Sequence, residues 1–192
     1  MKSFTHGTFI KNINIKNNEI YGERLILTIS SPSYEFIMHL MNGSQRSEVY
    51  RYKGYVFTLK KKRLLPKPPE FTNLVTFRTV SPLLIENRNG RPILVNDTEF
   101  EKEFNYYANL ATNEYFQRNL FEPIQIVNSS MKKVVIKEKL HQIDNNNIFI
   151  TGNQGIIKLQ GHPDDLKFIY EYGIGRRRSL GFGLLEVKEV DY

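Results

Sequence analysis

The chain has 192 residues, enough to bury one large hydrophobic core or two small ones. Its 27 lysines and arginines outnumber its 20 acidic residues, which gives a formal charge of +7, and it contains 11 tyrosines and 13 phenylalanines. Such a composition suits an RNA partner, because phosphates attract cations and unstacked bases lie on aromatic rings. The alternative is that most of the lysines are solvated surface residues and most of the aromatic residues belong to the core. The absence of cysteine excludes disulfides and thiolate metal sites.

No stretch approaches about 18 consecutive apolar residues, which a membrane-spanning helix needs. No signal peptide opens the chain either. The sequence therefore predicts a cytoplasmic protein with no membrane partner.

The first predicted elements are a β-hairpin, a helix and a further strand or strand pair. Residues 4–15 and 20–29 alternate apolar and polar residues on either side of the turn Asn17-Asn18. A helix follows, with Ser31 as its N-cap, Pro32 in its first position and Asn42-Gly43 at its end. Residues 49–59 then predict either one long strand or a pair.

A proline-rich linker follows, Leu64-Leu-Pro-Lys-Pro-Pro-Glu70, because three closely spaced prolines oppose both helix and central strand. We therefore predict a first domain at residues 1–64, a linker at 65–71 and a second domain at 72–192.

The second domain is predicted as β, α, β, β, α, β, the ferredoxin-like order. Its elements are a strand at 74–85, a helix from the capping box Thr98-Glu-Phe-Glu101 to Arg118, a hairpin at 131–143 and 148–159, a helix at 163–172 and a strand from Leu184.

The first domain has the same order without its opening strand and helix. The chain is therefore predicted as an α+β protein of tandem ferredoxin-like (RRM-like) domains, the first lacking its opening β-α unit. Either another segment completes the first sheet, or about fifty residues upstream of Met1 belong to it. The open sheet edge also makes a homodimer a hypothesis.

The glycine-rich tail Gly173-Ile-Gly-Arg-Arg-Arg-Ser-Leu-Gly-Phe-Gly183 is the strongest candidate for binding a polyanion. Glycines let backbone amides approach phosphate oxygens, and guanidinium groups bind phosphate through two donors. A helix ended by glycine and followed by a solvated basic turn is the alternative. Phe182 could stack on a base or pack under the loop. The predicted RNA-binding residues here are Gly173, Gly175, Arg176, Arg177, Arg178, Ser179, Gly181, Phe182 and Gly183.

A second basic surface is predicted on the hairpin. Lys133, Lys137 and Lys139 occupy odd positions and therefore share one face of a strand. The run Lys60-Lys-Lys-Arg63 is a weaker candidate, because charges at the end of a strand usually form a solvated edge.

Several ordered segments resemble the RAMP superfamily of CRISPR-associated proteins, and within it the endoribonuclease that processes CRISPR repeat RNA. The resemblance rests on Gly-x-Gly, five residues and Gly-Phe-Gly before the last strand. It also rests on Lys2-Ser-Phe-Thr5, Ile29-Ser-Ser-Pro32 and Val75-Thr-Phe-Arg-Thr-Val-Ser-Pro82.

The resemblance implies metal-independent RNA cleavage without a cofactor, in which a ribose 2′-hydroxyl attacks the phosphate and leaves a 2′,3′-cyclic phosphate. Lys2 matches the family's lysine, whereas the matching histidine would fall before Met1. His6 can share the face of Lys2 on one strand and is the candidate acid or base; an exposed strand histidine is the alternative. His39, His141 and His162 are interpreted as structural.

The implied partner is CRISPR repeat RNA, gripped by the glycine loop and the basic hairpin. A subunit that holds guide RNA in a CRISPR effector complex without cutting it is the alternative function. A ferredoxin-like RNA chaperone or ribosome-associated protein is a third, weaker alternative.

Overall fold

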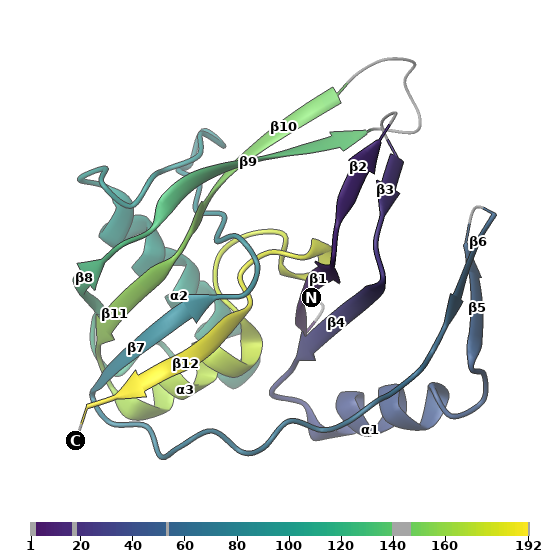
Figure 1. The fold of residues 1–192 in the computed structure, drawn as a ribbon. Helices are drawn as coiled ribbons and strands as arrows, with labels where there is room; N and C mark the ends of the chain where they lie inside the picture. Colours follow the sequence, from purple (N-terminus) through teal and green to yellow (C-terminus); the bar gives the residue numbers. More distant parts are fainter. Residues whose placement is uncertain (1–2, 17–18, 53, 140–146, 192) are drawn as a thin grey trace.

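The computed structural model describes residues 3–16, 19–52, 54–139 and 147–191, which form an α+β fold in two parts joined by an extended segment (Figure 1). The N-terminal part contains strands β1 to β6 and helix α1, and the C-terminal part contains β7 to β12 and helices α2 and α3. None of the helices in these residues is long and apolar enough to cross a membrane.

The N-terminal part opens with a hairpin in two sections. Its strands are β1 (Thr5–Lys11), β2 (Asn14–Lys16), β3 (Glu19–Tyr21) and β4 (Arg24–Ser30), with β1 pairing antiparallel to β4 and β2 to β3. Between β1 and β2, Asn12 adopts a left-handed φ of 53°, which asparagine tolerates better than most residues. The predicted hairpin is confirmed, while its predicted turn at 17–18 lies outside the described residues.

Helix α1 (Tyr34–Gly43) begins two residues later than predicted. Ser33 is its N-cap, and its hydroxyl accepts a hydrogen bond from the Phe36 amide at 3.2 Å. The prediction of Ser31 as the cap is wrong because its hydroxyl instead donates to the Ser3 carbonyl at 2.6 Å. Pro32 therefore precedes the cap. The helix buries none of its residues.

The remaining N-terminal strands form a separate antiparallel hairpin, β5 (Val49–Tyr52) and β6 (Tyr55–Thr58). Of the two predictions for residues 49–59, the strand pair is confirmed. All side chains of both strands are exposed, although valine, tyrosine and phenylalanine predominate.

An extended segment, residues 59–73, connects β6 to β7 and runs along the bottom of the view in Figure 1. Its prolines prevent helix and ladder hydrogen bonding, as predicted. The cations Lys60 to Arg63 are exposed, and Lys62 donates to the Ser44 hydroxyl at 3.3 Å. The division into domains 1–64 and 72–192 stays a prediction.

The C-terminal part is a ferredoxin-like sheet covered on one face by two helices (Figure 1). The sheet has the order β12-β7-β11-β8 and is antiparallel throughout. Its elements are β7 (Leu74–Thr79), β8 (Gln125–Ser129), β11 (Ile156–Gln160), β12 (Leu185–Val190), α2 (Phe100–Phe116) and α3 (Pro163–Tyr172). Val75, Phe77 and Leu159 from the sheet pack with Phe104 of α2 and Ile169 of α3, all almost fully buried.

A long hairpin, β9 (Lys132–Lys139) and β10 (Asn147–Gln154), projects from the sheet as an extension of β8 and β11 (Figure 1). The prediction of one strand over 148–159 is wrong, because Gly155 breaks it with a φ of +150°. A Cβ at Gly155 would lie 2.8 Å from the Ser130 carbonyl oxygen, so only glycine fits. β8 was not predicted, since an exposed edge strand with two apolar residues gives little periodic signal.

The start of α2 also differs from the prediction. Glu99 is the N-cap and makes no side-chain cap hydrogen bond, so the capping box at Thr98 is wrong. Asp97 forms the entry turn instead: its carboxylate accepts from the Leu94 amide at 2.7 Å, and its carbonyl accepts from the Phe100 amide at 3.0 Å.

Helix α3 is confirmed over its full predicted length. His162 caps it, with Nδ1 accepting from the Asp164 amide at 3.3 Å, a structural role as predicted. Asp165, in the first turn of α3, is fully buried, and its Oδ1 lies 2.8 Å from Arg118. Its other oxygen accepts from the Phe121 amide at 2.8 Å. Asp165 thus anchors the segment that follows α2.

Candidate nucleic-acid interface

The glycine loop, residues 173–183 between α3 and β12, folds tightly against its own backbone. Gly183 has a φ of +74°, and a Cβ there would lie 2.0 Å from the Ile174 carbonyl oxygen. A Cβ at Gly175 would lie 2.4 Å from the Leu84 carbonyl oxygen. These glycines are therefore required because the loop packs closely against the protein's own backbone. A phosphate-binding loop needs glycines for the same reason, so the sequence pattern alone does not distinguish the two uses.

Several loop amides donate within the protein. The amides of Ile174, Arg176 and Gly183 donate to the carbonyls of Gly183, Leu84 and Pro82 at 2.9–3.1 Å. These three donors are occupied, so any backbone contact to phosphate has to come from elsewhere in the loop. The arginine side chains become the main candidates.

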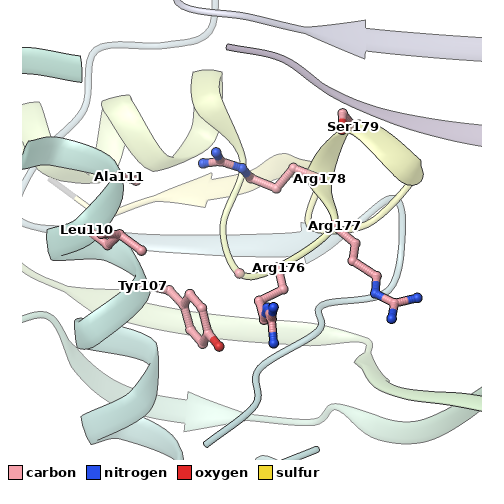
Figure 2. Close-up of a pocket in the computed structure, with 8 residues that line it drawn as sticks. Tyr107, Leu110, Ala111, Arg176, Arg177, Arg178 and Ser179 are labelled. Carbon is pink, nitrogen blue, oxygen red and sulfur yellow. The ribbon is translucent and has the colours of Figure 1, made fainter. Parts of the chain in front are cut away.

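The three consecutive arginines point in three different directions (Figure 2). Arg176 turns toward Tyr107 of α2 and forms an ion pair with the buried Glu86. Arg177 is exposed and points away from α2, from a left-handed backbone with a φ of 56°. Arg178 is buried, with its guanidinium stacked 3.6 Å over the Tyr172 ring.

Burial shifts the pKa values of both members of the stacked pair, Arg178 and Tyr172. Desolvation lowers the pKa of Arg178, while Tyr172 and Glu114 act in the opposite direction. Desolvation also raises the pKa of Tyr172, which Arg178 partly counteracts. Because a guanidinium stays protonated in proteins, Arg178 is a cation stacked on Tyr172 of α3, and we interpret it as the residue that holds the loop on the helices.

A cavity lies between α2 and the glycine loop (Figure 2). Its lining combines apolar and aromatic groups from α2 with cationic groups from the loop: Tyr107, Leu110, Ala111, Gly175, Arg176, Arg177, Arg178 and Ser179. The Tyr107 hydroxyl donates to the Glu86 carbonyl at 3.0 Å, and burial raises the pKa of Tyr107. Tyr107 and Glu86 were not identified from the sequence, since they are 69 or more residues from the loop arginines in the chain.

Strand β1 docks on the glycine loop and brings His6 to it. The Thr5 hydroxyl donates to the Phe182 carbonyl at 2.8 Å. A Cβ at Gly181 would lie 3.2 Å from Cε1 of the half-buried His6. His6 Nδ1 is buried and has no hydrogen-bond partner among the described residues. Gly181 therefore leaves room for the imidazole, and two predicted site residues lie together. Lys2 lies outside the described residues.

Phe182 is buried under its loop rather than presented to solvent. It is 5% exposed and packs with Leu84 and Ile150, to which Ile136 and Ile148 of the long hairpin add contacts. Of the two predictions for Phe182, stacking on a base or packing under the loop, the structure shows the second. The same cluster joins the inner face of the hairpin to the loop, so the two predicted RNA-binding surfaces are neighbours.

The outer face of the hairpin carries the predicted cations. Lys133 and Lys137 are exposed, and Val135 between them is 53% exposed. The side chain of Lys139 lies outside the described residues. The loop and the hairpin thus offer Arg177, Lys133 and Lys137 to solvent, together with Arg176, whose side chain is 52% exposed although it is paired with Glu86.

The other histidines lie elsewhere. His39 is exposed on α1 and lies 3.5 Å from Glu35, while His162 caps α3. His141 lies outside the described residues.

Comparison with known proteins relates this arrangement to one family. Residues 65–187 match the model of "CRISPR associated protein Cas6, C-terminal". A Methanocaldococcus jannaschii protein, "CRISPR-associated endoribonuclease Cas6 1", is 29% identical over 167 residues, 83% of this chain, and the chain spans 62% of its length. A solved Cas6-related protein of Pyrococcus furiosus has a TM-score of 0.78 at 22% identity, covering 98% of this chain and 79% of its own. A solved RAMP protein binding different RNA substrates has a TM-score of 0.69 at 18% identity, covering 97% and 80%.

Proposed function

Because the chain belongs to the Cas6 family of CRISPR-associated proteins, we propose that it binds CRISPR repeat RNA and cleaves precursor transcripts where β1 meets the glycine loop. The position of His6 carries the proposal. Its imidazole lies against Gly181, in a loop that also presents the exposed cation Arg177. A proton-transfer group beside a phosphate-binding cation is the combination that transesterification of RNA requires.

The reaction needs no group beyond the RNA and the side chains. The ribose 2′-hydroxyl loses its proton and its oxygen bonds to the adjacent phosphorus, while the bond from phosphorus to the 5′-oxygen breaks. The products are a 2′,3′-cyclic phosphate and a 5′-hydroxyl, which takes up a proton. His6 transfers one of these protons, and Lys2 stabilises the charge on the phosphorane.

Two surfaces are assigned to RNA binding in this proposal. Arg177 and the outer face of the hairpin, with Lys133 and Lys137, contact the phosphate backbone. Arg176, already paired with Glu86, and Arg178, stacked on Tyr172, position the loop. The three adjacent arginines therefore have different roles.

The experiment is a cleavage assay of repeat RNA in EDTA, with a 2′-deoxy substitution at the cut site. We expect cleavage that the 2′-deoxy substitution abolishes and that His6→Ala slows by at least about a hundredfold, the usual range for general acid or base catalysis. His39→Ala is the matched control, because His39 is exposed on α1 and far from the loop in sequence. Equal loss in both variants would contradict a role for His6.

A second candidate function is a non-catalytic subunit that holds guide RNA. The half-buried state of His6 favours it, because a ring packed between Phe4 and Gly181 has limited access to a substrate. Tight, salt-sensitive binding without cleavage by the wild-type chain would support this candidate over the enzyme.

A further inference from the structure

The cavity between α2 and the glycine loop has the size of a ligand site. Its volume of about 450 Å³ lies in the range of about 300–1,000 Å³ that is typical of small-molecule sites. Ala111, which lines it, lies on α2 between Tyr107 and Tyr115, one helical turn away on either side. The small side chain of Ala111 leaves room that a larger residue at this position would occupy.

Contacts within the protein fix both walls of this cavity. On the α2 side, the Tyr107 hydroxyl donates to the Glu86 carbonyl at 3.0 Å, which orients the ring. On the loop side, the Arg176 amide donates to the Leu84 carbonyl at 2.9 Å, and Gly175 has a φ of +88°. The Arg176 side chain is held by its ion pair with Glu86. A ligand therefore enters a preformed site, which lowers the entropic cost of binding.

The two walls differ in chemistry (Figure 2). Helix α2 contributes the Tyr107 ring and the Leu110 side chain, and the loop contributes the guanidinium of Arg176 and the exposed Arg177. An aromatic ring beside guanidinium groups is the combination that binds an unstacked nucleotide of RNA. The base stacks on the ring, while the cations contact base acceptors and phosphate.

The hydrogen-bonding groups of the cavity favour guanine among the four bases. Glu86 engages Nη1 of Arg176, and a guanidinium carries further donors beyond that nitrogen. Guanine offers such a fork two adjacent acceptors, O6 and N7, whereas adenine places an amino donor beside N7 and uracil offers a single acceptor. Among the described residues that line the cavity none is acidic, so nothing there accepts from the amino group of cytosine.

The cavity lies close to His6 along the glycine loop. Ser179 lines the cavity, and Gly181, two residues further on, lies against the His6 ring. Two residues span at most about 7 Å. Because a nucleic-acid strand advances about 3.4 Å per nucleotide, a base in the cavity belongs to a nucleotide within about three of a phosphate at His6.

We propose that this cavity binds one unstacked guanine of the RNA near the cleavage position. The base lies on Tyr107 and Leu110, and its O6 and N7 accept hydrogen bonds from Arg176. Arg176 keeps its pair with Glu86, and Arg177 contacts the adjacent phosphate. The inference rests on the proposed function, because RNA bound at the loop brings the guanine to the cavity. It adds a determinant of sequence, which phosphate contacts do not supply.

The first test removes the base from each nucleotide of the repeat RNA in turn by abasic substitution and measures binding. We expect one guanine whose removal weakens binding by at least about fivefold, as for a lost stacking contact. Tyr107→Leu should abolish this difference between the intact and abasic RNAs. Tyr106→Leu is the matched control, because Tyr106 is the adjacent residue on α2, is 52% exposed and is not among the residues that line the cavity. It should keep the difference.

The second test concerns the identity of the base. Adenine or 7-deazaguanine at the same position should weaken binding to the wild type by about tenfold, the usual loss for a hydrogen bond to a charged group. The double variant Glu86→Gln with Arg176→Gln removes both charges, so that no buried carboxylate is left unpaired. This variant should bind the guanine and adenine RNAs equally. Retained discrimination would overturn the proposal.

A crosslink in the wild-type chain makes the test independent of the folding of any variant. With 6-thioguanosine at the sensitive position, irradiation should join the RNA to a peptide of α2. A crosslink to other segments without α2 would overturn the proposal. Free guanosine monophosphate should bind more weakly than the RNA, and equal affinity would overturn the proposal in favour of a site for small nucleotides.

Failure of this inference is distinguishable from failure of the proposed function. A wild-type chain that binds and cleaves repeat RNA but depends on no single base would overturn the inference alone. The same holds for a base dependence that Tyr107→Leu leaves intact. A wild-type chain that does not bind repeat RNA would overturn both.

Discussion

The N-terminal and C-terminal parts both pair antiparallel strands and pack a helix near them, but among the described residues the large buried cluster belongs to the C-terminal part. Leu159 on β11 is 0% exposed, whereas Leu27 on β4 is 52% exposed. Strand β11 pairs with β7 on one edge and β8 on the other, whereas β4 pairs with β1 on one edge in the described residues. The comparison teaches that a strand buries its apolar face where other strands flank both of its edges and helices pack over it, because these neighbours remove its side chains from water.

The largest expected effect is a difference in stability between alanine variants of Leu159 and Leu27. Leu159→Ala should lower the free energy of unfolding by about 2–5 kcal/mol, because it opens a cavity in a packed core. Leu27→Ala should change it by less than about 0.5 kcal/mol, as for an exposed position. Urea unfolding of both variants measures the difference. Equal losses would mean that the N-terminal apolar face is covered in solution.

The second prediction compares two glycines. Gly183→Ala should destabilise the protein by about 1–3 kcal/mol, because φ is +74° and the new Cβ would meet the Ile174 carbonyl. Gly43→Ala, at the end of α1, places its Cβ in open space and should be neutral or stabilising by up to about 1 kcal/mol. Thermal unfolding distinguishes the two. Destabilisation by Gly43→Ala would contradict the open surroundings of α1.

The third prediction concerns the loop arginines. Arg177→Ala should weaken RNA binding by about tenfold, the loss of one charge-assisted contact of about 1.5 kcal/mol, and should affect stability less than it affects binding. Arg178→Ala should instead lower stability, since it removes the cation stacked on Tyr172. RNA titration and urea unfolding of both variants test this division. A purely stability-linked loss in Arg177→Ala would contradict it.

The fourth prediction concerns the hairpin. For about five phosphate contacts we expect a log-log salt slope of roughly −3 to −5, and removing two cations should reduce its magnitude by about 1.4–1.8. The variant is Lys133→Ala with Lys137→Ala, and Lys188→Ala on β12 is the control. Binding titrations across salt concentrations give the slopes. Equal slopes for the variant and the wild type would exclude the hairpin from phosphate binding.

The smallest expected effect is a pH dependence where the two parts meet. Burial raises the pKa of Glu171, with Lys167 acting in the opposite direction, and the Glu171 carbonyl accepts from the Ser30 hydroxyl of β4 at 2.8 Å. A raised carboxyl pKa favours the folded state when protonated, so this stabilisation is present at low pH and is lost as pH rises through the folded pKa. Glu171→Gln should flatten the fall in stability with rising pH. A wild-type pH profile parallel to that of the variant would contradict the raised pKa.

Local sequence signals identified most helices and strands, because apolar periodicity and the residues that begin or end an element depend on only a few neighbouring positions. The hairpin over 4–29 and helix α3 follow from alternation and from Pro163 with its N-cap. The cap assignment failed at Ser31 because its hydroxyl donates to the Ser3 carbonyl instead. It failed at Thr98 because Glu99 is the N-cap of α2.

The basic glycine loop was also evident from sequence, because its composition is local. Only the tertiary structure distinguished its arginines, by pairing Arg176 with Glu86 and stacking Arg178 on Tyr172. It likewise brought His6 to Gly181 across most of the chain. Such contacts depend on which elements pack together, which is decided by burial of the whole core and leaves no periodic trace in the chain.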